Sequence, residues 1–121
     1  MTRLNNKQER RVHPRIDTSL PVRIIANGYD FSTTTHNVSC VGAYCTIQKY
    51  IPPFTKLAIK MAIPEQETAA TNAKANVECK GVVVRSEDNA SGAFNIAIFF
   101  NEIKDGEKEK INHYLSRYVP K

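Results

Sequence analysis

Residues 94–100 read FNIAIFF, a stretch in which large apolar side chains return at every second position. These side chains are Phe94, Ile96, Ile98 and Phe100. A period of two is that of a β-strand with one buried face. Residues 57–63, LAIKMAI, and residues 42–48, GAYCTIQ, show the same alternation. The alternation predicts a fold built mainly from strands.

Turn signals divide the rest of the chain into further short strands. Asn27-Gly28 and residues 88–92 (DNASG) are typical turn sequences, and the small, polar residues 64–73 are predicted as a loop. The predicted strands are residues 22–25, 32–38, 42–48, 57–63, 77–85 and 94–100. Six strands at this spacing predict an antiparallel barrel or a sandwich.

The C-terminal end of the sequence changes to a helical pattern. Asp105 is predicted as the N-cap of a helix, and Pro120 lies just beyond its end. One apolar face follows the spacing i, i+3, i+4, i+7 through Ile111, Tyr114, Leu115 and Tyr118. We expect this single amphipathic helix to pack over one mouth of a barrel, with its tyrosines in core or rim packing.

Length and composition indicate one soluble globular domain. The chain has 121 residues, of which 41% are hydrophobic and 24% charged. No apolar run approaches the roughly 20 residues that a transmembrane helix needs. The first residues, MTRLNNKQERR, lack the apolar core of a secretory signal, which predicts a cytoplasmic protein without membrane insertion. The three cysteines form no CxxC or CxxH pair, so we expect reduced structural thiols and no metal site.

The excess positive charge is concentrated near the N-terminus. The formal net charge is +5, and residues 1–24 hold six basic against two acidic side chains. Residues 1–18 contain Pro14 and no usable periodicity, so they are predicted as a flexible basic arm before a domain at 19–119. Such a field suits an anionic partner, namely phosphate, nucleic acid or a membrane surface. A solvated, solubilising tail is the alternative interpretation.

Two short motifs flank the first predicted strands. Arg11 and Arg15 form an RxxxR motif with Arg10 immediately before it. Pro14 disfavours a helix here, so the α-carbons of Arg11 and Arg15 can lie up to about 13 Å apart. Their guanidinium groups can then approach a ligand from different directions. Arginine is planar and always charged, and it binds phosphate or the O6/N7 edge of guanine with two hydrogen bonds.

The second motif is NVSCVG at residues 37–42, which fits [DN]xSxxG. The amide oxygen of Asn37 is an acceptor for guanine N–H groups, and the Ser39 hydroxyl can bind phosphate or base. Gly42 permits a positive φ or a close backbone approach. Each motif alone is a weak signal, but their order around the first strands is much more specific.

With these motifs in place, the chain resembles the PilZ domain, a bacterial family of six-stranded antiparallel barrels with a C-terminal helix that bind cyclic di-GMP. The resemblance covers residues 9–119 and is carried by RRxxxR at 10–15, NVSxxG at 37–42, and IAIFF at 96–100 before a helix. It implies that Arg11 and Arg15 grip guanine and phosphate groups. It also implies that Asn37, Ser39 and Gly42 hold the ligand on the barrel surface. Many PilZ domains have Asp where this chain has Asn37, and the amide keeps an acceptor but loses the charge.

The resemblance further implies that the residue before RxxxR influences stoichiometry. An arginine there, Arg10, adds a stacking and phosphate contact, which predicts two ligand molecules per chain. We expect the two phosphates of the ligand to neutralise the arm and let it fold onto the barrel. The closed arm would then present a new surface to an unidentified downstream protein.

Two other classes of protein are alternatives to a ligand-binding module. A single-stranded nucleic-acid-binding barrel should interleave aromatic and basic residues on exposed strand faces, whereas Phe94, Phe99 and Phe100 lie in an apolar strand here, so neither DNA nor RNA is expected. A protein-interaction module of the same fold without ligand is the other alternative. The sequence shows no paired acid and base, no nucleophile elbow, no HExxH and no P-loop, so neither an enzyme nor a cofactor is predicted.

Overall fold

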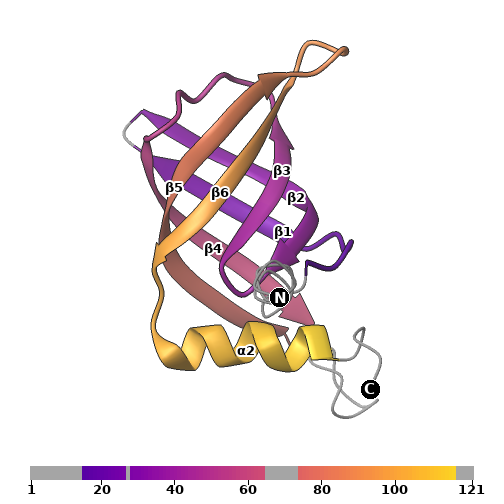
Figure 1. The fold of residues 1–121 in the computed structure, drawn as a ribbon, viewed down its shortest axis with the longest axis vertical. Helices are drawn as coiled ribbons and strands as arrows, with labels where there is room; N and C mark the ends of the chain where they lie inside the picture. The colour runs from indigo at the N-terminus through magenta and orange to yellow at the C-terminus, as the bar shows by residue number, and fades with distance from the viewer. Residues whose placement is uncertain (1–14, 27, 65–73, 117–121) are drawn as a thin grey trace, which may run out of the picture.

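The structure is a computed structural model that describes residues 15–26, 28–64 and 74–116. Its body is a closed antiparallel barrel in which the strands follow one another in the order β1-β2-β3-β6-β5-β4, and β4 pairs with β1 to close the ring (Figure 1). The strands are β1 (Pro21–Ala26), β2 (Tyr29–Ser39), β3 (Gly42–Ile47), β4 (Lys56–Pro64), β5 (Lys74–Asp88) and β6 (Phe94–Glu102). The prediction of a six-stranded antiparallel barrel is confirmed.

Alternation along the strands sends one set of side chains into the barrel and the other to solvent. In β4 every second residue is buried, and the intervening ones are exposed or half-buried. The inward set of this strand is Leu57, Ile59, Met61 and Ile63. Burying a side chain of this kind stabilises the fold by about 1.5–3 kcal/mol, so the alternation itself fixes which face of each strand points inward.

The predicted turns lie where two glycines have a positive φ. Gly28, with φ of +81°, stands between β1 and β2, and Gly92, with φ of +89°, stands between β5 and β6. In the second turn the Asn89 side chain accepts hydrogen bonds from the backbone N–H and the hydroxyl of Ser91. The other half of the first turn signal, Asn27, lies outside the described residues.

Most strands are longer than their apolar patterns predicted, and β2 and β5 exceed the prediction by the most residues. Strand β2 begins at Tyr29 and not at residue 32, and β5 runs from Lys74 to Asp88 and not only from 77 to 85. Pro64, predicted in a loop, ends β4 because it pairs with Lys74. Backbone pairing needs no apolar side chains, so polar strand ends escape a search for hydrophobic alternation. The remainder of the predicted loop, residues 65–73, lies outside the described residues.

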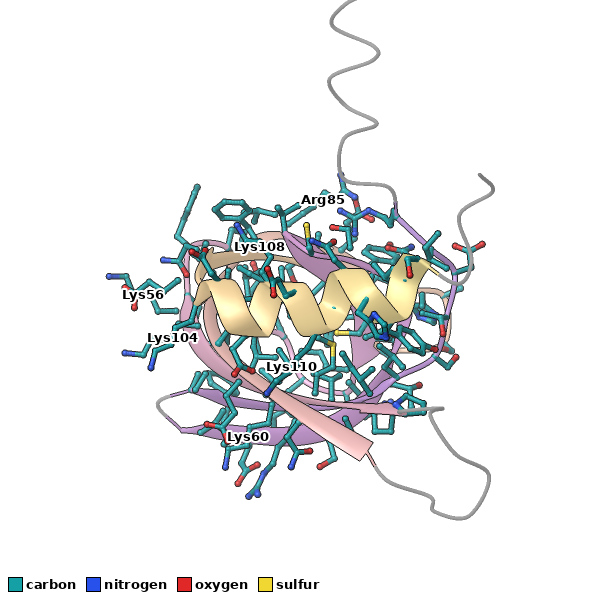
Figure 2. All side chains as sticks on the ribbon, turned by 90° about the horizontal axis from the view of Figure 1, so that it is seen from below. Lys56, Lys60, Arg85, Lys104, Lys108 and Lys110 are labelled. Atoms are coloured by element: carbon teal, nitrogen blue, oxygen red, sulfur yellow. The ribbon has the colours of Figure 1, made fainter. Side chains whose placement is uncertain are left out.

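Helix α2 (Asp105–Leu115) follows β6 and lies across one mouth of the barrel, as predicted (Figures 1 and 2). Its buried side chains are Ile111, Tyr114 and Leu115. The predicted N-cap is wrong by one residue: Lys104 is the N-cap and Asp105 begins the helix. Asp105 still stabilises the first turn, where carboxylates meet the positive end of the helix dipole. Tyr118 and Pro120 lie outside the described residues. Within the described part of the chain, no helix has the length and apolar character that crossing a membrane requires.

Part of the predicted arm is attached to the barrel. Residues 1–14 lie outside the described part of the chain, but Ile16 exchanges two backbone hydrogen bonds of 3.0 Å with Val38 of β2. Further along, the Thr18 hydroxyl lies 3.0 Å from the Tyr114 hydroxyl of α2. The buried Thr35 hydroxyl accepts from the Leu20 N–H at 2.9 Å and donates to the Thr18 carbonyl. These bonds hold residues 16–20 between β2 and α2.

Phe54, in the connection from β3 to β4, combines a φ of +74° with 80% exposure. A bulky residue in this region of φ costs of the order of 1–2 kcal/mol. We expect Phe54→Gly to raise the free energy of unfolding by about 0.5–1 kcal/mol in urea titration, because little burial is lost and the N–H still donates to the Val83 carbonyl. As a control, Tyr50→Gly should lower it, since Tyr50 packs edge-on against Phe94. A loss of stability in Phe54→Gly would contradict the argument.

Candidate ligand-binding site

The two motifs meet at the end of the barrel where β2 turns into β3. The antiparallel bridge between Ile16 and Val38 brings Arg15 to this turn, and the long Arg15 side chain reaches Asn37 diagonally across the pair. The Nη1 atom of Arg15 donates a hydrogen bond of 2.9 Å to Oδ1 of Asn37, across 22 residues of sequence. We call Arg15, Asn37, Ser39 and Gly42 the rim site. Of the six residues predicted to bind ligand, Arg10 and Arg11 lie outside the described residues.

The Arg15–Asn37 hydrogen bond fixes the chemistry that the rim site offers. Arginine carries only donors, so the amide oxygen of Asn37 must be the atom that faces Arg15. An amide oxygen has two lone pairs, and one remains for an N–H group of a ligand. The exposed Arg15 uses one of its five N–H donors in this bond, and the others are available to anionic oxygens. A cation and a neutral acceptor are therefore presented side by side.

A β-bulge is what turns Asn37 to the outside of the barrel. Thr35 of β2 pairs with Cys45 of β3, but Asn37 pairs with the adjacent Tyr44. Strand β2 therefore advances by two residues where β3 advances by one. With regular alternation Asn37 would point inward, as Thr35 does. The extra residue, His36, is exposed, and Asn37 becomes half-buried on the outer face. Bulges re-aim side chains in this way and are frequent next to functional sites.

Ser39 and Gly42 shape the turn between β2 and β3. Ser39 is 1% exposed, and its hydroxyl oxygen accepts a hydrogen bond of 3.2 Å from the Val41 N–H. A Cβ on Gly42 would lie 2.4 Å from the carbonyl oxygen of Ile98 in β6. Of the two reasons predicted for this glycine, the close backbone approach is therefore present, and a positive φ is not.

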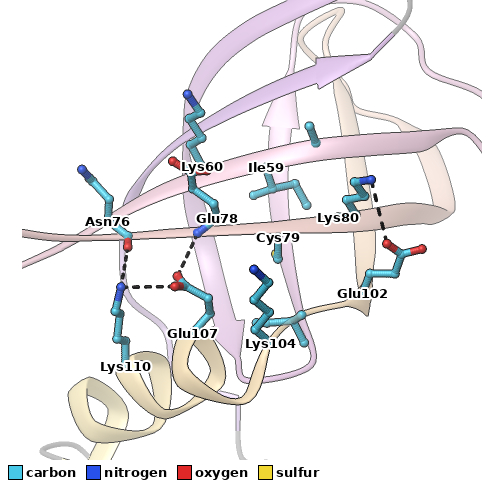
Figure 3. A pocket seen from close by; sticks show the side chains of 12 residues that line it. Ile59, Lys60, Asn76, Glu78, Cys79, Lys80, Glu102, Lys104, Glu107 and Lys110 are labelled. Carbon is cyan, nitrogen blue, oxygen red and sulfur yellow. Dashed lines mark hydrogen bonds and ion pairs between the residues drawn. The ribbon is translucent and has the colours of Figure 1, made fainter.

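A hollow of about 850 Å³ lies between helix α2 and strands β4 and β5, away from the rim site (Figure 3). Four lysines and three glutamates line it, and two of the lysines form ion pairs there: Lys110 Nζ lies 3.3 Å from Glu107 Oε2, and Lys80 Nζ lies 4.0 Å from Glu102 Oε1. Glu107 also accepts from the Glu78 N–H at 3.1 Å. A ligand with two phosphates would meet these three carboxylates, whereas none of the four rim-site residues is acidic, so the rim site suits an anion better than this hollow does.

The three cysteines, Cys40, Cys45 and Cys79, are buried. Burial raises the pKa of the Cys45 and Cys79 thiols to about 12, so both stay protonated at neutral pH. Among the described residues, no three histidine, cysteine or acidic side chains come together in a way that would hold a metal ion.

Two solved structures are similar to most of this chain. The structure of Bacillus subtilis inhibitor of motility (MotI/DgrA) matches 89% of this chain with a TM-score of 0.76 and 22% identity. The structure of Borreliella burgdorferi PlzA, crystallised in complex with c-di-GMP, matches 97% with a TM-score of 0.57 and 10% identity. The chain spans 50% and 56% of these two proteins, respectively. At these identities the likeness shows the fold alone.

A search among curated proteins finds no match to this sequence. The family model described as the PilZ domain does match it, over residues 9–117, which include both motifs, all six strands and helix α2. This is the fold and the family that the two motifs and the strand pattern indicated. The chain belongs to the PilZ domain family.

Proposed function

We propose that this chain is a receptor module that binds cyclic di-GMP at the rim site and passes the signal to a partner protein. The observation that carries the proposal is the hydrogen bond between Arg15 and Asn37, which joins the two motifs on one exposed surface. Membership of a family of cyclic di-GMP-binding domains supports the choice of ligand, as does the bound c-di-GMP of PlzA.

Two side chains of the rim site, those of Arg15 and Asn37, have a partner in the ligand. The guanidinium of Arg15 suits a phosphate, or the O6 and N7 acceptors of guanine. The remaining lone pair of Asn37 suits an N–H group on the opposite edge of the base. Buried Ser39 and closely packed Gly42 contribute by fixing the turn against which the ligand rests.

Arg10 and Arg11 complete the proposed site from the preceding segment. Ordering that segment costs about 1–2 kcal/mol per residue, so several charge-assisted hydrogen bonds of about 1.5–3 kcal/mol each are needed to offset the cost. Arg11 supplies such bonds to one ligand molecule, and Arg10 adds a stacking and phosphate contact for a second one. The segment closed over two ligands is the surface that a downstream partner recognises.

The ligand acts as a signal and not as a substrate. In the rim site Arg15 and Asn37 bind the ligand, and neither is a general base at neutral pH. The proposed output is a change of conformation, with the ligand released unaltered. Incubation of cyclic di-GMP with the protein should therefore leave the nucleotide intact when it is analysed by chromatography.

Isothermal titration calorimetry with cyclic di-GMP tests the proposed function. We expect saturable binding with two ligand molecules per chain, and no competition from a single-stranded oligonucleotide at the same salt concentration. One ligand per chain would overturn the role given to Arg10. Absence of heat with cyclic di-GMP, together with salt-dependent binding of the oligonucleotide, would favour a nucleic-acid-binding barrel instead.

A further inference from the structure

We infer that Tyr44 and Arg85 also bind the dinucleotide, so that the ligand lies across β3 and β6 and reaches β5. This inference rests on the proposed function and extends the rim site along one row of the barrel wall. Strands β5 and β6 run side by side in the front of Figure 1, and β3 and β2 follow β6 around the barrel.

Strand register places four residues in line across the outer face. Asn37 pairs with Tyr44, Tyr44 with Ala97, and Ala97 with Arg85. We call these four residues the outer row. Neighbouring strands are about 4.8 Å apart, so the row spans about 14 Å from end to end. That length gives a ligand with two bases and two phosphates a continuous surface to lie on.

A β-bulge stands at each end of the outer row. In β5, Val83 pairs with Ile98 but Arg85 pairs with the adjacent Ala97. Strand β5 therefore advances by two residues where β6 advances by one. Val83 points inward and is fully buried, and without the bulge Arg85 would point inward as well. This is the same device that turns Asn37 outward in β2. Two bulges that aim a polar side chain at one row indicate a surface built for a polar ligand.

The middle of the outer row combines a small side chain with aromatic ones. Ala97 is the smallest side chain in it and lies between Tyr44 on one strand and Arg85 on the other. Along β6 the next outward residue is Phe99, which is 46% exposed and pairs with Gly42 of the rim site. Aromatic rings beside a small residue offer a flat face on which a base can stack. Tyr44 is half-buried and its ring is already held, 5.9 Å from the ring of His36.

Arg85 has donors to spare for a phosphate or a guanine. Its side chain is 61% exposed, and its Nε atom lies 3.3 Å from Glu87 Oε2 in an exposed ion pair, a type that contributes little to stability. Figure 2 shows Arg85 on the opposite side of the barrel from Lys60. Arg85 is not among the residues that line the hollow between α2, β4 and β5.

Calorimetric titration of matched variants with cyclic di-GMP tests the inference. Arg85→Ala should weaken binding by about tenfold or more, because a two-point contact to phosphate or base is lost. Arg23→Ala is the control, since Arg23 is also a strand arginine, 52% exposed and paired with a carboxylate, but it lies on β1. It should change the dissociation constant by less than about twofold. Glu87→Gln should tighten binding, because it frees Arg85 and removes a like charge from the phosphates.

Tyr44 is tested by two substitutions that separate its ring from its hydroxyl. Tyr44→Ala should weaken binding by about fivefold or more, whereas Tyr44→Phe should bind as the parent does. Equal affinity in the parent, Arg85→Ala and Tyr44→Ala would overturn the inference and leave the rim site intact. A parent chain that does not bind cyclic di-GMP would overturn the proposed function and the inference together.

Discussion

Replacing Arg15 by alanine is expected to weaken cyclic di-GMP binding by about a hundredfold. Hydrogen bonds from an arginine to charged or two-acceptor groups contribute about 1.5–3 kcal/mol, and about 2.7 kcal/mol corresponds to a hundredfold change in affinity. The loss also removes the group that holds the Asn37 amide, 2.9 Å away, in its binding orientation. Calorimetric titration at constant ionic strength measures the effect, since a charge change alters the salt dependence.

A lysine at the same position separates charge from geometry. Arg15→Lys keeps the positive charge but loses the planar pair of donors, so we expect an affinity between that of the parent and that of Arg15→Ala. Stability should be nearly unaffected in both variants, because Arg15 is exposed. Urea unfolding checks this point. Binding of Arg15→Ala within about twofold of the parent, with an unchanged unfolding midpoint, would remove Arg15 from the site.

The barrel could be predicted from the sequence because its inward side chains are apolar almost without exception. In β4 and β6 the buried positions hold only Leu, Ile, Met and Phe, so a period of two is visible in a single strand. The turns between β1 and β2 and between β5 and β6 could also be predicted, since Gly28 and Gly92 supply the positive φ that these connections require. The family resemblance implied that Arg15 and Asn37 serve one ligand, but the hydrogen bond between them was not predicted.

Features that depend on a partner strand could not be read from one strand. The bulges at Thr35–Asn37 and Val83–Arg85 are defined by what lies opposite, so the alternation rule assigns Arg85 to the wrong face of the barrel. For the same reason Tyr44 looked like one polar-face residue among several, and nothing linked it to Arg85. The hydrophobic pattern did not predict the full length of β5, because the ends of this strand are polar and pair through backbone groups.

Gly42→Ala is expected to lower the free energy of unfolding by about 2–3 kcal/mol. The added Cβ would lie 2.4 Å from the Ile98 carbonyl oxygen, a backbone atom of the β3–β6 ladder that has no rotamer through which to move away. Relief requires the two strands to separate where Gly42 pairs with Phe99. Urea unfolding followed by circular dichroism measures the loss, and the midpoint should fall while the slope is unchanged.

Gly106→Ala is the matched control, because it makes the same chemical change where a Cβ meets nothing within 4 Å. Gly106 lies in helix α2, and alanine there should stabilise the fold by up to about 1 kcal/mol. The two glycines should thus respond with opposite signs. Since Gly42 also borders the rim site, its variant should lose affinity for cyclic di-GMP even at temperatures where it remains folded. If Gly42→Ala proves as stable as the parent, the close approach of β3 to β6 cannot be what requires a glycine at this turn.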